Sequence, residues 1–268
     1  MSSGFVSSRS RITASPKRPS RSASSASKTT LPQAAPGEAG IPWATGVALA
    51  DVNADGLLDV YISYAGDVAG DRRANELYIH QGVDDDGMPS FEEAAEDYGV
   101  ANQGYSTHAA FFDYDRDGDL DLYLVNNSFR PVSSFGLRNI RHERNPLGGD
   151  KLLRNDDGRF VDVSEAAGIY ESEIGFGLGV AVSVVNQDGW PDLYVSNDFF
   201  EQDYLYINQR DGTFVDRVAQ DMPYISYFSM GLDAADINND ARPEIYVTDM
   251  LPEDDHRVKV TAAFEGWD

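Results

Sequence analysis

Apolar and polar residues alternate over short stretches between residue 39 and about residue 250, and this period of two predicts β-strands. In four places such a strand leads into an acidic loop, and a second short strand follows the loop. The residues four and two positions before each loop are apolar or small, and a Tyr lies at a fixed offset after it, as Tyr61 does after the first loop. Strand, loop and strand predict a β-hairpin.

A second pair of strands is predicted within the repeat. The pair is predicted at residues 77–81 and 90–94, at 152–163 and at 205–217. Asp157-Gly158 in the second of these pairs and Asp211-Gly212 in the third are hairpin turn signals. The acidic loops start at residues 51, 113, 184 and 236, so the unit recurs at intervals of several tens of residues. Four antiparallel strands per unit predict the blades of an all-β propeller rather than a sandwich.

The acidic loops share one arrangement of oxygen-bearing residues. Positions one, three, five and nine carry Asp, Asn or Glu in most copies, and position six is Gly56, Gly118 or Gly189. Crowded carboxylates repel one another unless a cation lies between them, and an all-oxygen set without Cys or His favours Ca²⁺. The candidate ligands are Asp51, Asn53, Asp55, Leu57 and Asp59; Asp113, Asp115, Asp117, Asp119 and Asp121; Asn186, Asp188, Trp190 and Asp192; and Asp236, Asn238, Asp240, Arg242 and Glu244, with Leu57, Asp119, Trp190 and Arg242 acting through their backbone carbonyls.

The four loops predict up to four Ca²⁺ sites of unequal strength. The second loop, 113–121, has the most carboxylates and should be the strongest. The third loop, 184–192, has Val184 in place of the first ligand and should be the weakest. The fourth has Ala241 at the glycine position and Glu244 at position nine, so we place it below the first loop. The alternative is that the loops are polar hairpin turns without a metal.

These motifs resemble a known repeat. The combination of GVALADVNADGLLDVY at 46–61 with LYINQRDGTF at 205–214 is similar to the FG-GAP or VCBS repeat of integrin α-subunit propellers and secreted bacterial proteins. The stretches at 147–169 and 246–257 resemble more narrowly the cartilage-acidic-protein and UnbV-like group of extracellular proteins. The resemblance implies a propeller, usually of seven blades, with calcium-bound hairpins on one face.

The repeats predict about three and a half four-stranded blades in an open arc. They start near residues 46, 108, 179 and 231, and residues 38–41 resemble 165–169, which end the second repeat. An arc that does not close exposes strand edges and blade faces, so we expect a fragment of a longer protein, whose missing blades would cover these faces, or self-association. Residues 38–268 form the predicted propeller segment.

Residues 1–37 form a separate segment. They contain six Lys or Arg residues, no acidic residue, and many Ser and Pro, a composition that predicts a disordered tail. A transit peptide or a misplaced start are the alternatives, since no apolar signal-peptide core is present. The whole chain has a net charge of −24 and no long apolar run, which argues against a nucleic-acid partner and a membrane span. The absence of cysteine does not decide the compartment.

No catalytic motif is recognised in the sequence. The histidines at 80, 108, 142 and 256 lie in separate repeats, and Ser106 and Ser229 are interpreted as strand-entry residues. We therefore expect a non-catalytic, calcium-binding interaction or adhesion module, secreted or located extracellularly, at the cell surface or in the periplasm. The alternative is an accessory propeller of a larger secreted hydrolase or lyase.

One stretch, residues 128–150, interrupts the repeat between the second and third strands of its blade. Four arginines, at 130, 138, 141 and 144, give it a local positive charge, and Phe129 and Phe135 lie among them. One interpretation is a long loop packed over its own blade, with the arginines paired to nearby acids. The other is a surface that binds an acidic protein or a glycan.

Overall fold

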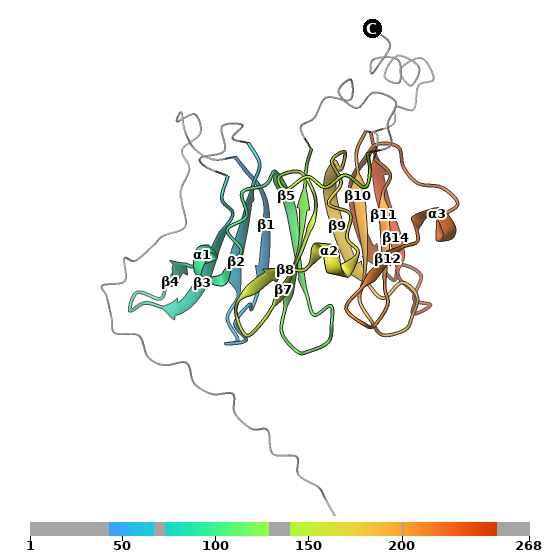
Figure 1. Ribbon diagram of the computed structural model, residues 1–268. Helices are drawn as coiled ribbons and strands as arrows, with labels where there is room; N and C mark the ends of the chain where they lie inside the picture. Colours follow the sequence, from blue (N-terminus) through green and yellow to red (C-terminus); the bar gives the residue numbers. More distant parts are fainter. Residues whose placement is uncertain (1–42, 67–72, 129–139, 200, 251–268) are drawn as a thin grey trace, which may run out of the picture.

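The computed structural model describes residues 43–66, 73–128, 140–199 and 201–250 (Figure 1). Within them the chain folds into antiparallel β-sheets that are separate from one another, and none closes into a barrel. Three sheets have four strands and one has two. The predicted all-β fold of about three and a half blades is therefore confirmed for these residues.

Each sheet is one repeat, and we number the sheets as blades 1 to 4 in chain order. In blades 1 to 3 the strands pair in sequence order, so the acidic hairpin is followed by a second hairpin, as predicted. Blade 1 contains β1 (Ala44–Ala50), β2 (Asp59–Tyr64), β3 (Glu76–Val83) and β4 (Pro89–Glu93). Blade 2 contains β5 (Ser106–Phe112), β6 (Asp121–Asn126), β7 (Lys151–Asn155) and β8 (Phe160–Asp162).

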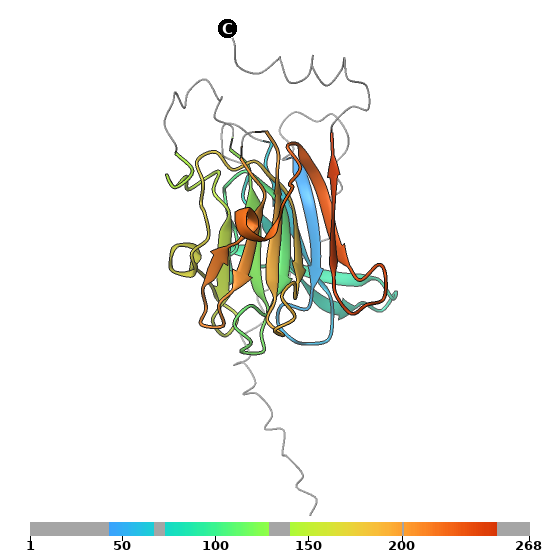
Figure 2. The same ribbon diagram turned by 90° about the vertical axis from the view of Figure 1, so that its right-hand side faces the viewer.

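Blades 3 and 4 continue the series. Blade 3 contains β9 (Gly177–Ser183), β10 (Asp192–Asn197), β11 (Tyr204–Asn208) and β12 (Phe214–Asp216). Blade 4 is the hairpin of β13 (Ser229–Ala235) and β14 (Glu244–Asp249). Figure 2 shows these last two strands in red, joined by the loop that carries the fourth acidic motif.

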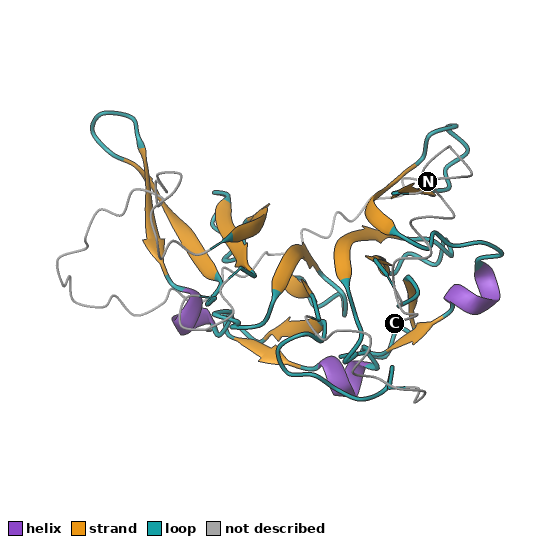
Figure 3. Ribbon diagram, turned by 90° about the horizontal axis from the view of Figure 1, so that it is seen from above, coloured by secondary structure: helices purple, strands orange, loops and turns teal. Residues whose placement is uncertain are grey.

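The blades lie side by side along an open arc (Figure 3). The first strands of successive blades contact each other, β1 with β5, β5 with β9, and β9 with β13. Side-chain hydroxyls join these strands, because Thr45 Oγ1 donates to the carbonyl of Ser106 at 2.5 Å and Thr107 Oγ1 donates to that of Gly177 at 2.7 Å. A Cβ at Gly46 would lie 2.6 Å from the carbonyl oxygen of Thr107, so the close approach of β1 to β5 requires glycine there.

The hydrophobic cores lie between blades. Strand β5 shows how the period of two serves both neighbours: Ala109 packs in the core shared with blade 1, and Phe112 packs in the core shared with blade 3. A third core joins blade 3 to blade 4 and includes Tyr194 and Leu205. Both faces of a middle blade are therefore buried, and each fully buried Leu or Phe contributes about 1.5–3 kcal/mol.

The repeated tyrosine shows which blade faces are covered. Tyr61, Tyr123 and Tyr194 are 0%, 0% and 2% exposed, whereas Tyr246 at the same position of blade 4 is 64% exposed. On the first blade, Val47 and Leu49 are also exposed. Within the described residues, the arc therefore has one uncovered apolar face at each end.

Three short helices were not predicted from the sequence. They are α1 (Ala95–Tyr98), α2 (Ser164–Ala167) and α3 (Val218–Asp221), and each follows the fourth strand of its blade. Gly99 and Gly168, both at φ +80°, end the first two in the left-handed conformation. In the described part of the chain no helix has the length and apolarity to cross a membrane. The predicted disordered tail, residues 1–37, lies outside the described residues.

Candidate metal centre

The four acidic loops occupy equivalent places in the four blades. They connect β1 to β2, β5 to β6, β9 to β10 and β13 to β14, and they lie along one edge of the arc, the lower edge in Figure 1. The sequence predicted them in separate repeats, and in the structure each loop belongs to a different blade. Any metal they hold is therefore bound by one loop at a time.

Two positions of each loop adopt the left-handed backbone conformation. Position six does so at Gly56, Gly118 and Gly189, as the glycine pattern predicted, and Ala241 adopts the same conformation at φ +64°. The fourth loop thus keeps the turn without glycine, at a strain of about 1 kcal/mol. Position four, which the sequence pattern did not single out, is also left-handed, with residues Ala54, Arg116, Gln187 and Asn239.

The carboxylate at position nine fixes the hairpin to the rest of the blade. Asp121 is fully buried, and its two oxygens accept hydrogen bonds from the backbone N–H of Tyr114 at 3.0 Å and of Asn155 in β7 at 2.9 Å. Asp59 and Asp192 accept the equivalent pairs of backbone hydrogen bonds in blades 1 and 3. Burial raises the pKa of Asp121 to about 7, although the two N–H donors favour the charged form. This structural role was not predicted, and the metal-ligand role of position nine stays a prediction.

The second loop has the closest cluster of carboxylates. Ligand oxygens of Asp113, Asp115 and Asp117 lie within 4.8 Å of one another. The Oδ1 atoms of Asp113, Asp115 and Asp119 are buried and have no hydrogen-bond partner. Burial and the neighbouring carboxylates raise the pKa of Asp115 and raise that of Asp119 to about 6.

Unpartnered, buried carboxylate oxygens fit a bound cation, because a buried anion is costly unless it is paired. Such atoms, among the acidic loops as far as the structure describes them, all belong to the second loop. The sequence pattern assigned Asp119 only a backbone carbonyl, whereas the structure brings its side chain to the cluster as well. The sequence signal for this was that position seven of the second loop is itself an acidic residue.

The first and fourth loops are satisfied more by their own backbone. In the first loop, both oxygens of Asp51 accept backbone N–H groups, from Asp55 at 2.9 Å and Gly56 at 2.8 Å. In the fourth loop, Asp236 accepts the equivalent pair, and Glu244 accepts hydrogen bonds from the backbone of Ile237 and the side chain of Asn238. These loops have the ligand types that Ca²⁺ requires but a less complete cluster than the second loop.

The third loop contains a positive side chain. Arg210, from the turn between β11 and β12, lies against Asp188, with Nη2 at 2.9 Å and Nε at 3.0 Å from Oδ2. The amide nitrogen of Asn186 also donates to this oxygen at 3.0 Å. Although burial acts to raise the pKa of Asp188, the hydrogen bonds from Trp190 N–H, Arg210 and Asn186 lower it overall. Arg210 was not among the site residues predicted from the sequence.

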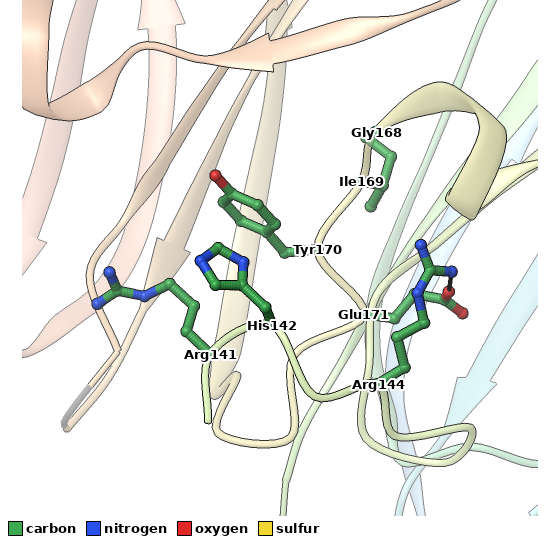
Figure 4. A pocket seen from close by; sticks show the side chains of 7 residues that line it. All are labelled: Arg141, His142, Arg144, Gly168, Ile169, Tyr170 and Glu171. Carbon is green, nitrogen blue, oxygen red and sulfur yellow. Dashed lines mark hydrogen bonds and ion pairs between the residues drawn. The ribbon is translucent and has the colours of Figure 1, made fainter. Parts of the chain in front are cut away.

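A small cavity lies beside the described part of the 128–150 stretch. It has a volume of about 210 Å³ and is lined by Arg141, His142, Arg144, Gly168, Ile169, Tyr170 and Glu171 (Figure 4). The rings of His142 and Tyr170 meet edge to face at 5.4 Å between centroids. The cavity therefore lies between the end of this stretch and the segment that follows α2.

The two arginines of this cavity are paired inside the molecule. Arg141 Nε lies 2.6 Å from Glu201 Oε1, and Arg144 pairs with Glu171. These acids lie in segments that lead into or belong to blade 3, so the stretch packs against the next blade as well as its own. The other two arginines of the stretch, at 130 and 138, lie outside the described residues.

Of the comparisons with known proteins, the one with family models supports the repeat. No curated protein matches the chain at a significant level. The family model for the FG-GAP-like repeat matches residues 185–247, from the third acidic loop through most of β14. The acidic hairpin and the four-stranded sheets recur in the same order along the arc, and residues 185–247 carry an FG-GAP-like repeat.

Proposed function

We propose that this chain is a calcium-stabilised interaction module and that the second acidic loop is its principal Ca²⁺ site. The observation that carries the proposal is the carboxylate cluster of Asp113, Asp115 and Asp117, together with the buried, unpartnered Oδ1 atoms of Asp113, Asp115 and Asp119. Three carboxylates in such a cluster repel one another in the absence of a cation. A set of hard oxygen ligands without Cys or His favours Ca²⁺ over transition metals.

The chain's own residues prepare this site. Asp113, Asp115, Asp117 and Asp119 provide oxygens, and Asp121 holds the loop to β7 through its backbone hydrogen bonds. A bound Ca²⁺ supplies positive charge that offsets the repulsion. The first and fourth loops are proposed as weaker sites with the same position-by-position arrangement.

The proposed role of the module is binding, without catalysis. Its support is the FG-GAP-like repeat at residues 185–247, which is a structural unit. We place the protein outside the cell, at its surface or in the periplasm, where millimolar Ca²⁺ suits weak sites. A protein or glycan is the proposed partner, and a binding surface on the 128–150 stretch would have to use groups other than Arg141 and Arg144, which pair with Glu201 and Glu171. The second candidate, an accessory propeller of a secreted hydrolase or lyase, has the same support from the repeat.

Calcium titration by calorimetry tests the proposal. We expect the wild-type chain to bind Ca²⁺ and Asp115→Asn to weaken the tightest site at least about tenfold, because it removes one charged ligand. Asp86→Asn is the matched control, since Asp86 is an exposed acid in the turn between β3 and β4 and belongs to none of the four loops. Absence of binding at millimolar Ca²⁺ in the wild type would contradict the proposal.

A further inference from the structure

The third acidic loop differs from the others in the groups that surround its central acid. Val184 at position one has no side-chain oxygen, and the amide nitrogen of Asn186 faces Asp188 as a donor. As Asp59 and Asp121 do in their own loops, Asp192 accepts two backbone N–H groups, here from Val185 and Asn208. Asp188 is the remaining acid, and its side chain is only 10% exposed. These residues do not fit a calcium site.

The positive charge in this loop comes from the chain itself. We propose that the guanidinium of Arg210 takes the place of a metal ion in the third loop, which therefore folds and stays folded without calcium. This inference rests on the proposed function of the other loops. Arg210 makes two contacts with Asp188 Oδ2, at 2.9 and 3.0 Å, and a guanidinium remains charged at all physiological pH values.

The turn between β11 and β12 places this arginine. Here Gln209 N–H donates to the carbonyl of Thr213 and encloses three residues, whereas in blade 2 Asp156 N–H donates to that of Arg159 and encloses two. Blade 2 has Asp157 where blade 3 has Arg210, and both residues are left-handed, at φ +54° and +67°. The longer turn therefore carries a cation to its loop. In blade 2, Arg154, whose charge acts on Asp115 of the second loop, forms its ion pair with Asp156 of its own turn.

A hydrogen bond from its own backbone also holds Arg210 in this position. Its N–H donates to Asn208 Oδ1 at 2.8 Å, and Asn208 is itself buried at the end of β11. The third loop also contacts both neighbours: Trp190 lies 5.4 Å from the guanidinium of Arg116 in the second loop, and Gln187 Nε2 donates to the carbonyl of Ala241 in the fourth at 3.4 Å. A metal-independent third loop thus lies between two loops that the proposal assigns to calcium.

Counting bound calcium tests the inference. Equilibrium dialysis of the full chain over a range of free Ca²⁺ should give the same number of bound ions and the same binding curve for Asp188→Asn as for the wild type, whereas Asp115→Asn should shift the tightest binding step at least about tenfold to higher Ca²⁺. Loss of one ion in Asp188→Asn would overturn the inference. A wild-type chain that binds no calcium would contradict the proposed function instead, and the thermal comparison below would then decide the role of Arg210 alone.

Thermal unfolding gives the second, independent readout. Arg210→Ala should lower the melting temperature by about 2–4 °C, and by the same amount in calcium and in chelator. Arg217→Ala is the matched control, because Arg217 forms an exposed pair with Asp221 on the same blade and should cost less than about 2 °C. An unchanged melting temperature in Arg210→Ala, or a loss that calcium restores, would overturn the inference.

Discussion

Tyr123→Phe removes a single oxygen atom, and we expect it to lower the melting temperature clearly. The hydroxyl of Tyr123 is fully buried and donates to Asp150 Oδ2 at 2.9 Å. Asp150 is itself 4% exposed, so water cannot replace the lost donor. A buried hydrogen bond to a charged or partly charged group is worth about 1–3 kcal/mol. At about 2–4 °C per kcal/mol for a chain of this size, the melting temperature should fall by about 2–12 °C.

The matched variant is Tyr246→Phe. Tyr246 has the same position in its repeat but is 64% exposed, so its hydroxyl is available to water and its loss should change the melting temperature by less than about 2 °C. Both variants are compared by calorimetry at one pH and one calcium concentration. Equal effects of the two substitutions would refute the inference that blade 2 is enclosed and blade 4 has an uncovered face.

Three further predictions follow from the loops and the turns. In chelator, burial raises the pKa of Asp121 to about 7 and that of Asp119 to about 6. The folded state therefore keeps protons that the unfolded state releases near pH 4, and the free energy of unfolding should fall as pH rises from about 4 to 7. A free energy of unfolding that does not change with pH, measured by denaturant titration, would contradict this. Asp117→Ala should reduce calcium affinity more than Asp188→Ala, measured by competition with a calcium dye; equal losses would overturn the ranking of the loops. Gly168→Ala should destabilise by more than about 1 kcal/mol, because its φ is +80° and a Cβ would lie 2.8 Å from a backbone carbonyl of blade 3; unchanged unfolding in urea would count against the close packing of α2.

The strands and their pairing were accessible from the sequence because their signals are local. The period of two in β1 and the Asp-Gly turn after β7 each depend on residues within about ten positions of one another. The recurrence of the acidic loop also predicted the number of blades. The helices could have been found from Gly168 and the Ser164-Glu165 start of α2, but such short helices leave a weak periodic signal.

The parts of the site that were missed depend on contacts across the fold. Arg210 lies 22 residues after Asp188 in the chain, and no spacing rule connects an arginine in one hairpin turn with an acid in another. The N–H groups that satisfy Asp121 come from the loop and from β7, so its structural role becomes visible only when the register of the sheet is known. The side chain of Asp119 was passed over because the pattern assigned that position to a carbonyl.

Thermal unfolding of the full chain in chelator and in calcium shows whether the buried carboxylates of the second loop require a cation. At a free Ca²⁺ concentration of about 100 times the dissociation constant, binding to the folded state adds about 2.7 kcal/mol, which corresponds to a rise of about 5–11 °C in melting temperature. We expect this rise for the wild type, its reversal by chelator, and a smaller rise for Asp115→Asn. The same melting temperature with and without calcium, measured at low ionic strength, would contradict it.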